Sequence, residues 1–186
     1  MDVDRWFFAR TGYTGEDGLE IIVPQEEITA LWASLLEAGV KPCGLAARDT
    51  LRLEAGMLLY GQDMDESITP LESGLAWTLK LQPEDRDFIG MGALISQKQQ
   101  GLKHKLVGLT LEGKGIMRPG QRVIVDGSPD GVITSGTYSP TLGKSIAFAR
   151  VPITTGSEVQ VDIRGKLFSA RVGKPRFIKH GAAVLI

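Results

Sequence analysis

The first eighty residues combine two kinds of hydrophobic pattern. From Glu26 onward, apolar side chains recur at spacings of three and four as far as Gly39, which predicts an amphipathic helix. A second helix is expected over residues 46–55, with Gly56 as its C-terminal stop. Short apolar runs rich in aromatic and branched side chains predict strands over residues 5–9, 19–23 and 75–79. This mixture indicates the α+β class.

The pattern changes in the second half of the chain. The polar, charged residues 82–87 indicate a linker, and residues 88–95 lead into a short helix that ends near Gly101. Beyond this helix the apolar period becomes two, which is typical of strands. Six strands separated by glycine-containing turns are expected over residues 107–111, 122–125, 131–135, 145–149, 159–163 and 166–172. Short strands at this spacing favour a small barrel or a sandwich.

Composition places the chain among ordinary globular proteins. Its 186 residues suffice for one large domain or two small ones, with 42% hydrophobic and 23% charged residues. The formal net charge of −1 provides no electrostatic footprint for nucleic acid. No apolar run approaches the roughly 18 residues that a bilayer span needs, and no signal peptide opens the chain. We therefore expect a cytoplasmic protein with no nucleic-acid or membrane partner.

Cysteine and histidine usage argues against two kinds of site. The single cysteine, Cys43, excludes an internal disulfide and a thiolate metal cluster, and we expect it to be a buried structural thiol rather than a nucleophile. The two histidines, His104 and His180, are far apart in sequence, and neither has a second ligand at metal spacing. No metal site is expected.

The glycine-rich loop at residues 12–18, Gly-Tyr-Thr-Gly-Glu-Asp-Gly, is the strongest candidate for chemistry. Three glycines in seven residues let the backbone turn sharply and approach another group closely. Between them stand two adjacent acids. Asp17 is expected to form the turn through local hydrogen bonds. Glu16, considered alone, is either a solvated turn residue or an acid presented to a ligand.

Longer motifs identify a family. Residues 10–18, 45–56 and 60–64, followed by Phe88-Ile89-Gly90, resemble the T-protein family of the glycine cleavage system, the tetrahydrofolate-dependent aminomethyltransferases. That family has three domains around a folate-binding funnel. The resemblance implies part of the folate-binding α+β domain over residues 1–82. It implies a six-stranded antiparallel β-barrel over residues 83–186.

The resemblance is to the C-terminal half of the family only. The family's first domain, and the catalytic aspartate that it places near the reacting amine of folate, have no counterpart in this sequence. No catalytic residue is therefore assigned. We expect a fragment with little or no activity alone.

The resemblance implies five residues that contact tetrahydrofolate. The carboxylate of Glu16 would accept the parallel ring N–H and exocyclic NH₂ of the pterin. Arg48 would hold a carboxylate or the pterin carbonyl. Without the resemblance, the alternative is a surface charge pattern with Asp49. Met57, where some relatives have tyrosine, would provide an apolar wall. Arg176 and Lys179 are alternative basic contacts near the C-terminus, or ordinary surface charges.

Three further side chains have two interpretations each. Arg52 lies one helical turn from Arg48, so it is either a structural partner or a support for the ligand-binding residues. Trp77 and Tyr138 could stack on a flat ligand, but large aromatic side chains are usually buried, so we expect both in the core.

For a complete enzyme, the resemblance implies transfer of the aminomethyl carbon from the lipoyl arm of H-protein to tetrahydrofolate, with release of ammonia. This reaction belongs to glycine catabolism and one-carbon metabolism. The implied partners are lipoylated H-protein and tetrahydrofolate. One alternative is a non-catalytic folate-binding or protein-docking module. Exposed strand edges near residues 4–9 would also favour a dimer of this chain.

Overall fold

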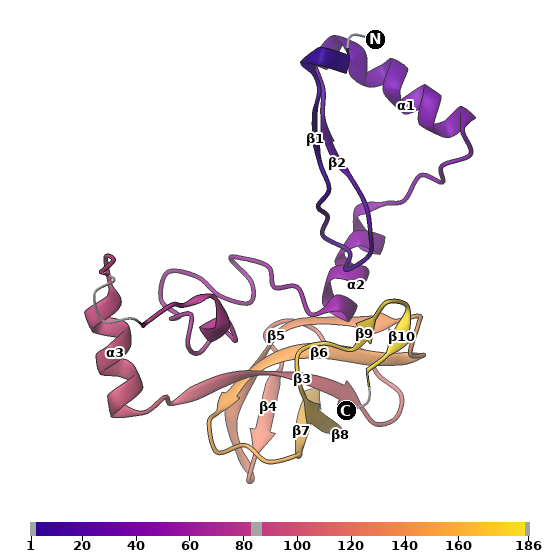
Figure 1. Ribbon diagram of the computed structural model, residues 1–186. Coiled ribbons are helices and arrows are strands. Elements are labelled where there is room, and N and C mark those ends of the chain that lie inside the picture. Colours follow the sequence, from indigo (N-terminus) through magenta and orange to yellow (C-terminus); the bar gives the residue numbers. More distant parts are fainter. Residues whose placement is uncertain (1–2, 83–86, 185–186) are drawn as a thin grey trace.

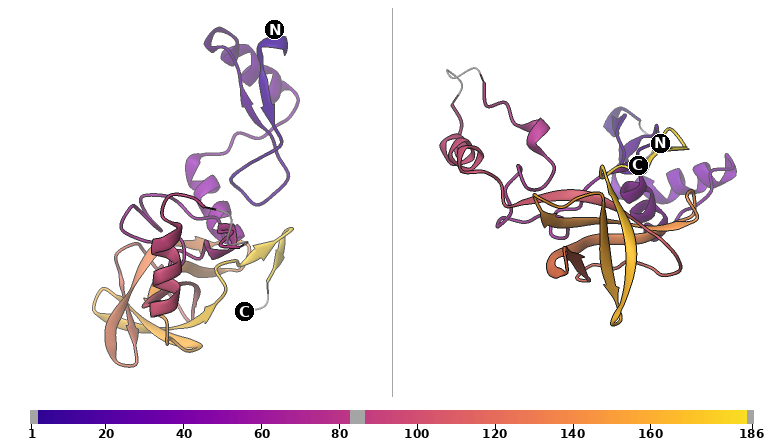
Figure 2. Two further views of the ribbon diagram at one scale, coloured as in Figure 1. Left: turned by 60° about the vertical axis from the view of Figure 1, so that its left-hand side comes forward. Right: turned by 90° about the horizontal axis from the view of Figure 1, so that it is seen from below.

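A computed structural model describes residues 3–82 and 87–184. An arm, here defined as residues 3–44, is joined through helix α2 to a β-barrel (Figure 1). The arm and helix α3 project from the barrel in different directions (Figures 1 and 2). The elements of the arm are η1 (Val3–Arg5), β1 (Phe7–Ala9), β2 (Glu20–Ile22), η2 (Gln25–Glu27) and α1 (Ile28–Glu37). The first two strands and the first helix therefore confirm the predicted pattern.

The second half forms a closed barrel of six antiparallel strands in the order β3-β6-β5-β4-β7-β8. All six predicted strands are present, and the barrel replaces the alternative of a sandwich. The strands are β3 (His104–Leu111), β4 (Arg122–Val125), β5 (Ser128–Ser139), β6 (Lys144–Pro152), β7 (Glu158–Ile163) and β8 (Lys166–Gly173). The expected α+β class with a six-stranded barrel is confirmed.

Two hydrophobic clusters fix the barrel and the helix beside it. On β6, Ala147 and Ala149 belong to the interior cluster of the barrel, while the alternate residues Ile146 and Phe148 belong to a second cluster. This alternation follows from the two-residue period of a strand. The second cluster contains Leu53 of α2 (Leu45–Ala55), together with the Phe177 ring that stacks on Phe148. α2 and the C-terminal segment are therefore held on the outside of β6.

The chain ends in a short hairpin beside α2. Strands β9 (Ile178–Lys179) and β10 (Ala182–Ala183) pair antiparallel (Figure 1). The backbone N–H of Phe177 donates to the carbonyl oxygen of Glu54 at 2.9 Å. The segment that leads into this hairpin is therefore bonded to α2.

The segment between α2 and the barrel differs from expectation. Residues 75–79 were predicted to form a strand, but the structure has a short 3-10 helix there, η3 (Ala76–Thr78). A strand needs a neighbour to satisfy its backbone groups, and no described strand pairs with this segment. The predicted short helix is present as α3 (Met91–Gln100).

Two sequence-based expectations fall at the same region. Residues 83–86 of the predicted linker lie outside the described residues. The division into domains at residues 82 and 83 stays a prediction.

Within the described ranges, no helix has both the length and the apolar character that crossing a bilayer requires.

Gly56 ends α2 in the left-handed region, with φ of 86°. A Cβ at Gly56 would overlap the carbonyl oxygen of Pro175 and lie 3.2 Å from the Cα of Arg176. Gly56→Ala should therefore lower the free energy of unfolding by more than the about 1–2 kcal/mol that left-handed backbone costs other residues. Gly61→Ala is the control, because Gly61 has φ of 84° and open space around it. Equal losses in urea unfolding of the two variants would contradict the overlap.

Candidate functional site

The glycine loop lies against the last turn of α2. Gly15 has φ of 79°, and a Cβ on it would overlap the Cβ of Ala55. The loop and helix can approach this closely because one residue has no side chain and the other has a single methyl group. Tyr13 anchors the loop on its other side, since its hydroxyl donates to the carbonyl oxygen of Leu58. The close approach predicted for the loop is thus made to α2.

The two acids of the loop differ in their surroundings. Asp17 accepts two hydrogen bonds from Arg10, at 3.0 Å from Nε and 2.9 Å from Nη2. The Arg10 guanidinium, followed by a backbone hydrogen bond from Gly18, lowers the pKa of Asp17. The carboxylate of Glu16 makes no hydrogen bond or ion pair with any residue that the structure describes. The loop therefore neutralises one acid and leaves the adjacent one available.

Glu16 lines a cavity of about 290 Å³ formed by the glycine loop, the end of α2 and the C-terminal hairpin. Four of the five predicted folate contacts meet there: Glu16, Met57, Arg176 and Lys179. The rest of the wall is made by Gly15, Ala55, Ile178 and His180. Nε of Arg176 donates to the carbonyl oxygen of Ala55 at 3.2 Å, so this guanidinium is oriented by α2. The cavity thus combines one unpaired carboxylate, an apolar wall and basic groups.

The fifth predicted residue, Arg48, is not part of the cavity lining. Its guanidinium lies over the ring of Tyr13, 5.0 Å from the ring centroid, in a cation–π contact. Burial raises the pKa of Tyr13 above its usual 10.0, and the nearby positive charges of Arg52 and Arg48 oppose this shift. Tyr13 therefore remains a neutral hydrogen-bond donor at neutral pH. Arg48 therefore contacts the glycine loop through the ring of Tyr13.

Sequence reasoning missed Tyr13 as an anchor and His180 as part of the cavity wall. Tyr13 lay inside the glycine motif, which was the available signal. His180 had no comparable signal, because its position depends on the hairpin folding back onto α2.

Arg52 and Asp63 form a buried ion pair, with the two side chains 1% and 0% exposed. Nη1 of Arg52 lies 2.9 Å from Oδ2 of Asp63, and its Nη2 donates to Oγ of Ser135 at 3.0 Å. Thr134 donates to the other oxygen of Asp63 at 2.6 Å. The pair therefore connects α2, the loop that follows it and strand β5. Of its two interpretations, Arg52 is a structural partner.

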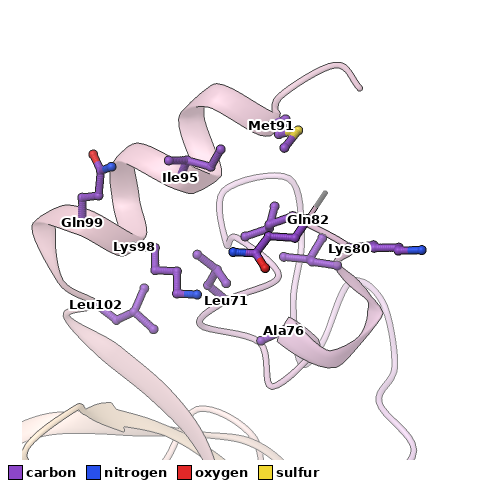
Figure 3. A pocket seen from close by; sticks show the side chains of 11 residues that line it. Leu71, Ala76, Lys80, Gln82, Met91, Ile95, Lys98, Gln99 and Leu102 are labelled. Carbon is purple, nitrogen blue, oxygen red and sulfur yellow. The ribbon is translucent and has the colours of Figure 1, made fainter. Parts of the chain in front are cut away.

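A larger cavity of about 880 Å³ lies between α3 and the segment around η3 (Figure 3). Its wall is mainly apolar, with Leu71, Met91 and Ile95 around the space and the amine of Lys98 at its side (Figure 3). None of the described residues in its lining is a carboxylate, so these residues offer no acceptor pair for two parallel N–H donors. None of the five predicted folate contacts is in it.

Three expectations about burial were wrong. Cys43 is exposed, not buried, and Trp77 and Tyr138 are 83% and 47% exposed rather than in the core. Among the described residues, no group of three or more His, Cys, Asp or Glu side chains is placed to hold a metal ion.

Comparisons with known proteins identify the family. Residues 3–83 match the GCVT N-terminal domain, and residues 104–179 match the glycine cleavage T-protein C-terminal barrel domain. The chain is 77% identical to an aminomethyltransferase of Legionella pneumophila strain Corby, covering 99% of this chain and 51% of that protein. It is 58% identical to an aminomethyltransferase of Methylococcus capsulatus, covering 96% of this chain and 50% of that protein.

A solved structure agrees with these relatives. The crystal structure of glycine cleavage system aminomethyltransferase T from Bartonella henselae aligns with a TM-score of 0.86 and 35% identity, covering 94% of this chain and 50% of that chain. The chain thus spans about half the length of the relatives it matches. The resemblance drawn from the glycine loop and the α2 motif is confirmed. The two matched domains and the shared barrel show that this chain belongs to the glycine cleavage T-protein family.

Proposed function

We propose that this chain binds tetrahydrofolate in the cavity between the glycine loop, α2 and the C-terminal hairpin. The observation that carries the proposal is the carboxylate of Glu16, which lines this cavity and has no partner among the described residues. Its two oxygens match the spacing of the two parallel N–H donors of a pterin ring, and ionised acceptors form the stronger hydrogen bonds. Asp17 is excluded from this role because Arg10 occupies both of its oxygens.

The size and wall of the cavity support the same ligand. A volume of about 290 Å³ is just below the about 300–1,000 Å³ usual for ligand pockets. It therefore suits the bicyclic ring, with the rest of the molecule extending outward. Met57 and Ile178 provide apolar surface for the ring, and the basic side chains of Arg176 and Lys179, which also line the cavity, would pair with the anionic tail. Both basic residues are retained as candidates.

The relatives are aminomethyltransferases, and we propose that this chain supplies the folate-binding part of that activity. In the complete reaction, N5 of tetrahydrofolate would attack the aminomethyl carbon on the lipoyl arm of H-protein and the lipoyl thiol would leave. N10 would then bond to the same carbon, ammonia would leave, and methylene-tetrahydrofolate would form. The contribution of this chain is to hold the pterin in one orientation, which reduces the entropy cost of the encounter. None of the cavity residues is assigned to the reacting amine. We therefore propose that the isolated chain has little or no turnover.

Isothermal titration calorimetry with tetrahydrofolate tests the binding proposal, and we expect saturable binding with one site per chain. No saturable heat at millimolar ligand would contradict it. A parallel assay with tetrahydrofolate and H-protein that carries the aminomethyl group on its lipoyl arm should show no ammonia release above background. A rate equal to that of a full-length relative would contradict the proposed inactivity. Binding without turnover would identify the chain as a non-catalytic folate-binding module.

A further inference from the structure

The arm has no core of its own. None of the described residues from Asp4 to Leu51 is buried, whereas the barrel and α2 together contain two buried clusters. The arm is nevertheless held in a defined shape. Arg5 pairs with Glu26 at 3.0 Å, and the indole N–H of Trp6 donates to Glu27 at 3.1 Å, so the start of α1 is fixed beside the hairpin.

Large apolar side chains of the arm share two exposed stripes. Phe7 and Ile22 are cross-strand partners, so they lie on the same face of the hairpin, and they are 60% and 67% exposed. Ile28, Trp32 and Leu36 follow at intervals of four along α1 and are 47%, 53% and 43% exposed. We call these five residues the arm apolar surface.

Such a surface is typical of an interface. A hairpin of two strands is at best marginally stable in water without a third strand or a packed face. β1 and β2 pair only with each other among the described strands, so their outer edges are open to another strand. Several large exposed apolar side chains on a fixed framework are typical of sites where another protein binds.

Charge argues against a second copy of this chain as the occupant. Residues 3–44 contain seven carboxylates and three basic side chains. Two arms packed face to face would therefore bring together two surfaces of net charge −4, and like charges at an interface oppose association. The occupant favoured by this charge is a different protein surface.

The length of the relatives indicates which protein would provide the surface that covers the arm. The Legionella relative is matched over 51% of its length, so it has an unmatched half of similar size. The Bartonella structure aligns with 94% of this chain, arm and barrel together, at a TM-score of 0.86. The arm therefore keeps the position relative to the barrel that it has in a chain carrying that other half.

We propose that the arm apolar surface binds the unmatched half of a T-protein-family chain when that half is supplied as a separate polypeptide. The contact would cover Phe7 and Ile22 on the hairpin and the stripe on α1. This proposal rests on family membership and on the exposed surface. It does not require tetrahydrofolate binding.

Co-expression of the 186-residue chain with the unmatched half of the Legionella relative tests this proposal. We expect the two polypeptides to co-purify, with light scattering giving the mass of one copy of each. A soluble half that elutes apart from the chain would overturn the proposal. So would a half that stays insoluble beside the chain, or a chain that forms only homodimers.

Matched variants locate the contact. Ile22→Asp places a charge on the arm apolar surface, and Leu167→Asp places one on β8, where Leu167 is 53% exposed. Neither side chain is buried in the free chain, so circular dichroism should show both variants folded. We expect Ile22→Asp to weaken the association at least tenfold and Leu167→Asp to leave it unchanged. Equal weakening in the two variants, or none in Ile22→Asp, would overturn the proposed surface.

Discussion

Glu16→Ala should weaken tetrahydrofolate binding by about 10- to 100-fold, because it removes both acceptors offered to the pterin. Hydrogen bonds to a charged group contribute about 1.5–3 kcal/mol, and each 1.4 kcal/mol is about tenfold in affinity. Glu16→Gln keeps one oxygen and replaces the other with a donor, so its affinity should fall between those of wild type and Glu16→Ala. Calorimetric titration of all three proteins measures the effect.

Asp17→Asn is the matched control for this prediction. Asp17 is the adjacent acid on the same exposed loop, but its carboxylate is engaged by Arg10. We expect its replacement to leave affinity nearly unchanged. If Asp17→Asn lost as much affinity as Glu16→Ala, the effect would come from the loop's shape or general charge rather than from a specific contact. Unchanged binding in Glu16→Ala would remove the main support for the proposed site.

Asp63→Ala should lower the free energy of unfolding by about 3 kcal/mol, the lower end of the range for breaking a buried pair, because the buried guanidinium of Arg52 then keeps only the partly exposed Asp49 as a counter-charge. The loss is large since Arg52 and Asp63 are 1% and 0% exposed, so water cannot readily replace the missing carboxylate. It would also leave the hydroxyl of Thr134 and the backbone N–H of Leu59 without an acceptor that each now uses. Urea unfolding followed by circular dichroism measures this change.

Arg122→Ala is the comparison for the buried pair. Arg122 also pairs with an aspartate, Asp162, but its side chain is 64% exposed, and exposed pairs contribute about 0–1 kcal/mol. A loss in Asp63→Ala no larger than in Arg122→Ala would show that the buried pair is not a main support of α2. The double variant Arg52→Met, Asp63→Leu should recover part of the loss, because no buried charge then lacks a partner.

Much of the secondary structure followed from local pattern. The six barrel strands were visible because apolar residues alternate between glycine turns, and a strand exposes its two faces in alternation. Gly56 marked the end of α2 because it alone accepts a left-handed cap without strain. The strand predicted over residues 75–79 was wrong because an apolar run is equally compatible with a strand and with a short helix. Only a pairing partner distinguishes the two.

The role of the predicted site residues in folate binding stays a prediction, but the structure shows how these residues are arranged. The family resemblance indicated Glu16, Met57, Arg176 and Lys179, and the structure brings these four to one cavity. The structure places the guanidinium of Arg48 over the ring of Tyr13 instead of in this cavity. The difference between Glu16 and Asp17 was foreseen only in outline. The bidentate contact from Arg10 depends on how the loop folds back on the preceding strand.

The sequence by itself determined most of the elements, the family and the identity of the candidate acid, because periodicity, glycine positions and motifs are local properties of the chain. The tertiary structure alone decided which charges are buried together and which apolar residues remain in water. Arg52 and Asp63 are eleven positions apart, and their pairing depends on β5 closing over them. Likewise, Trp32 has a pattern typical of a buried helix face but is 53% exposed. Burial depends on what packs against a residue, and the residue's own neighbours in sequence do not encode that.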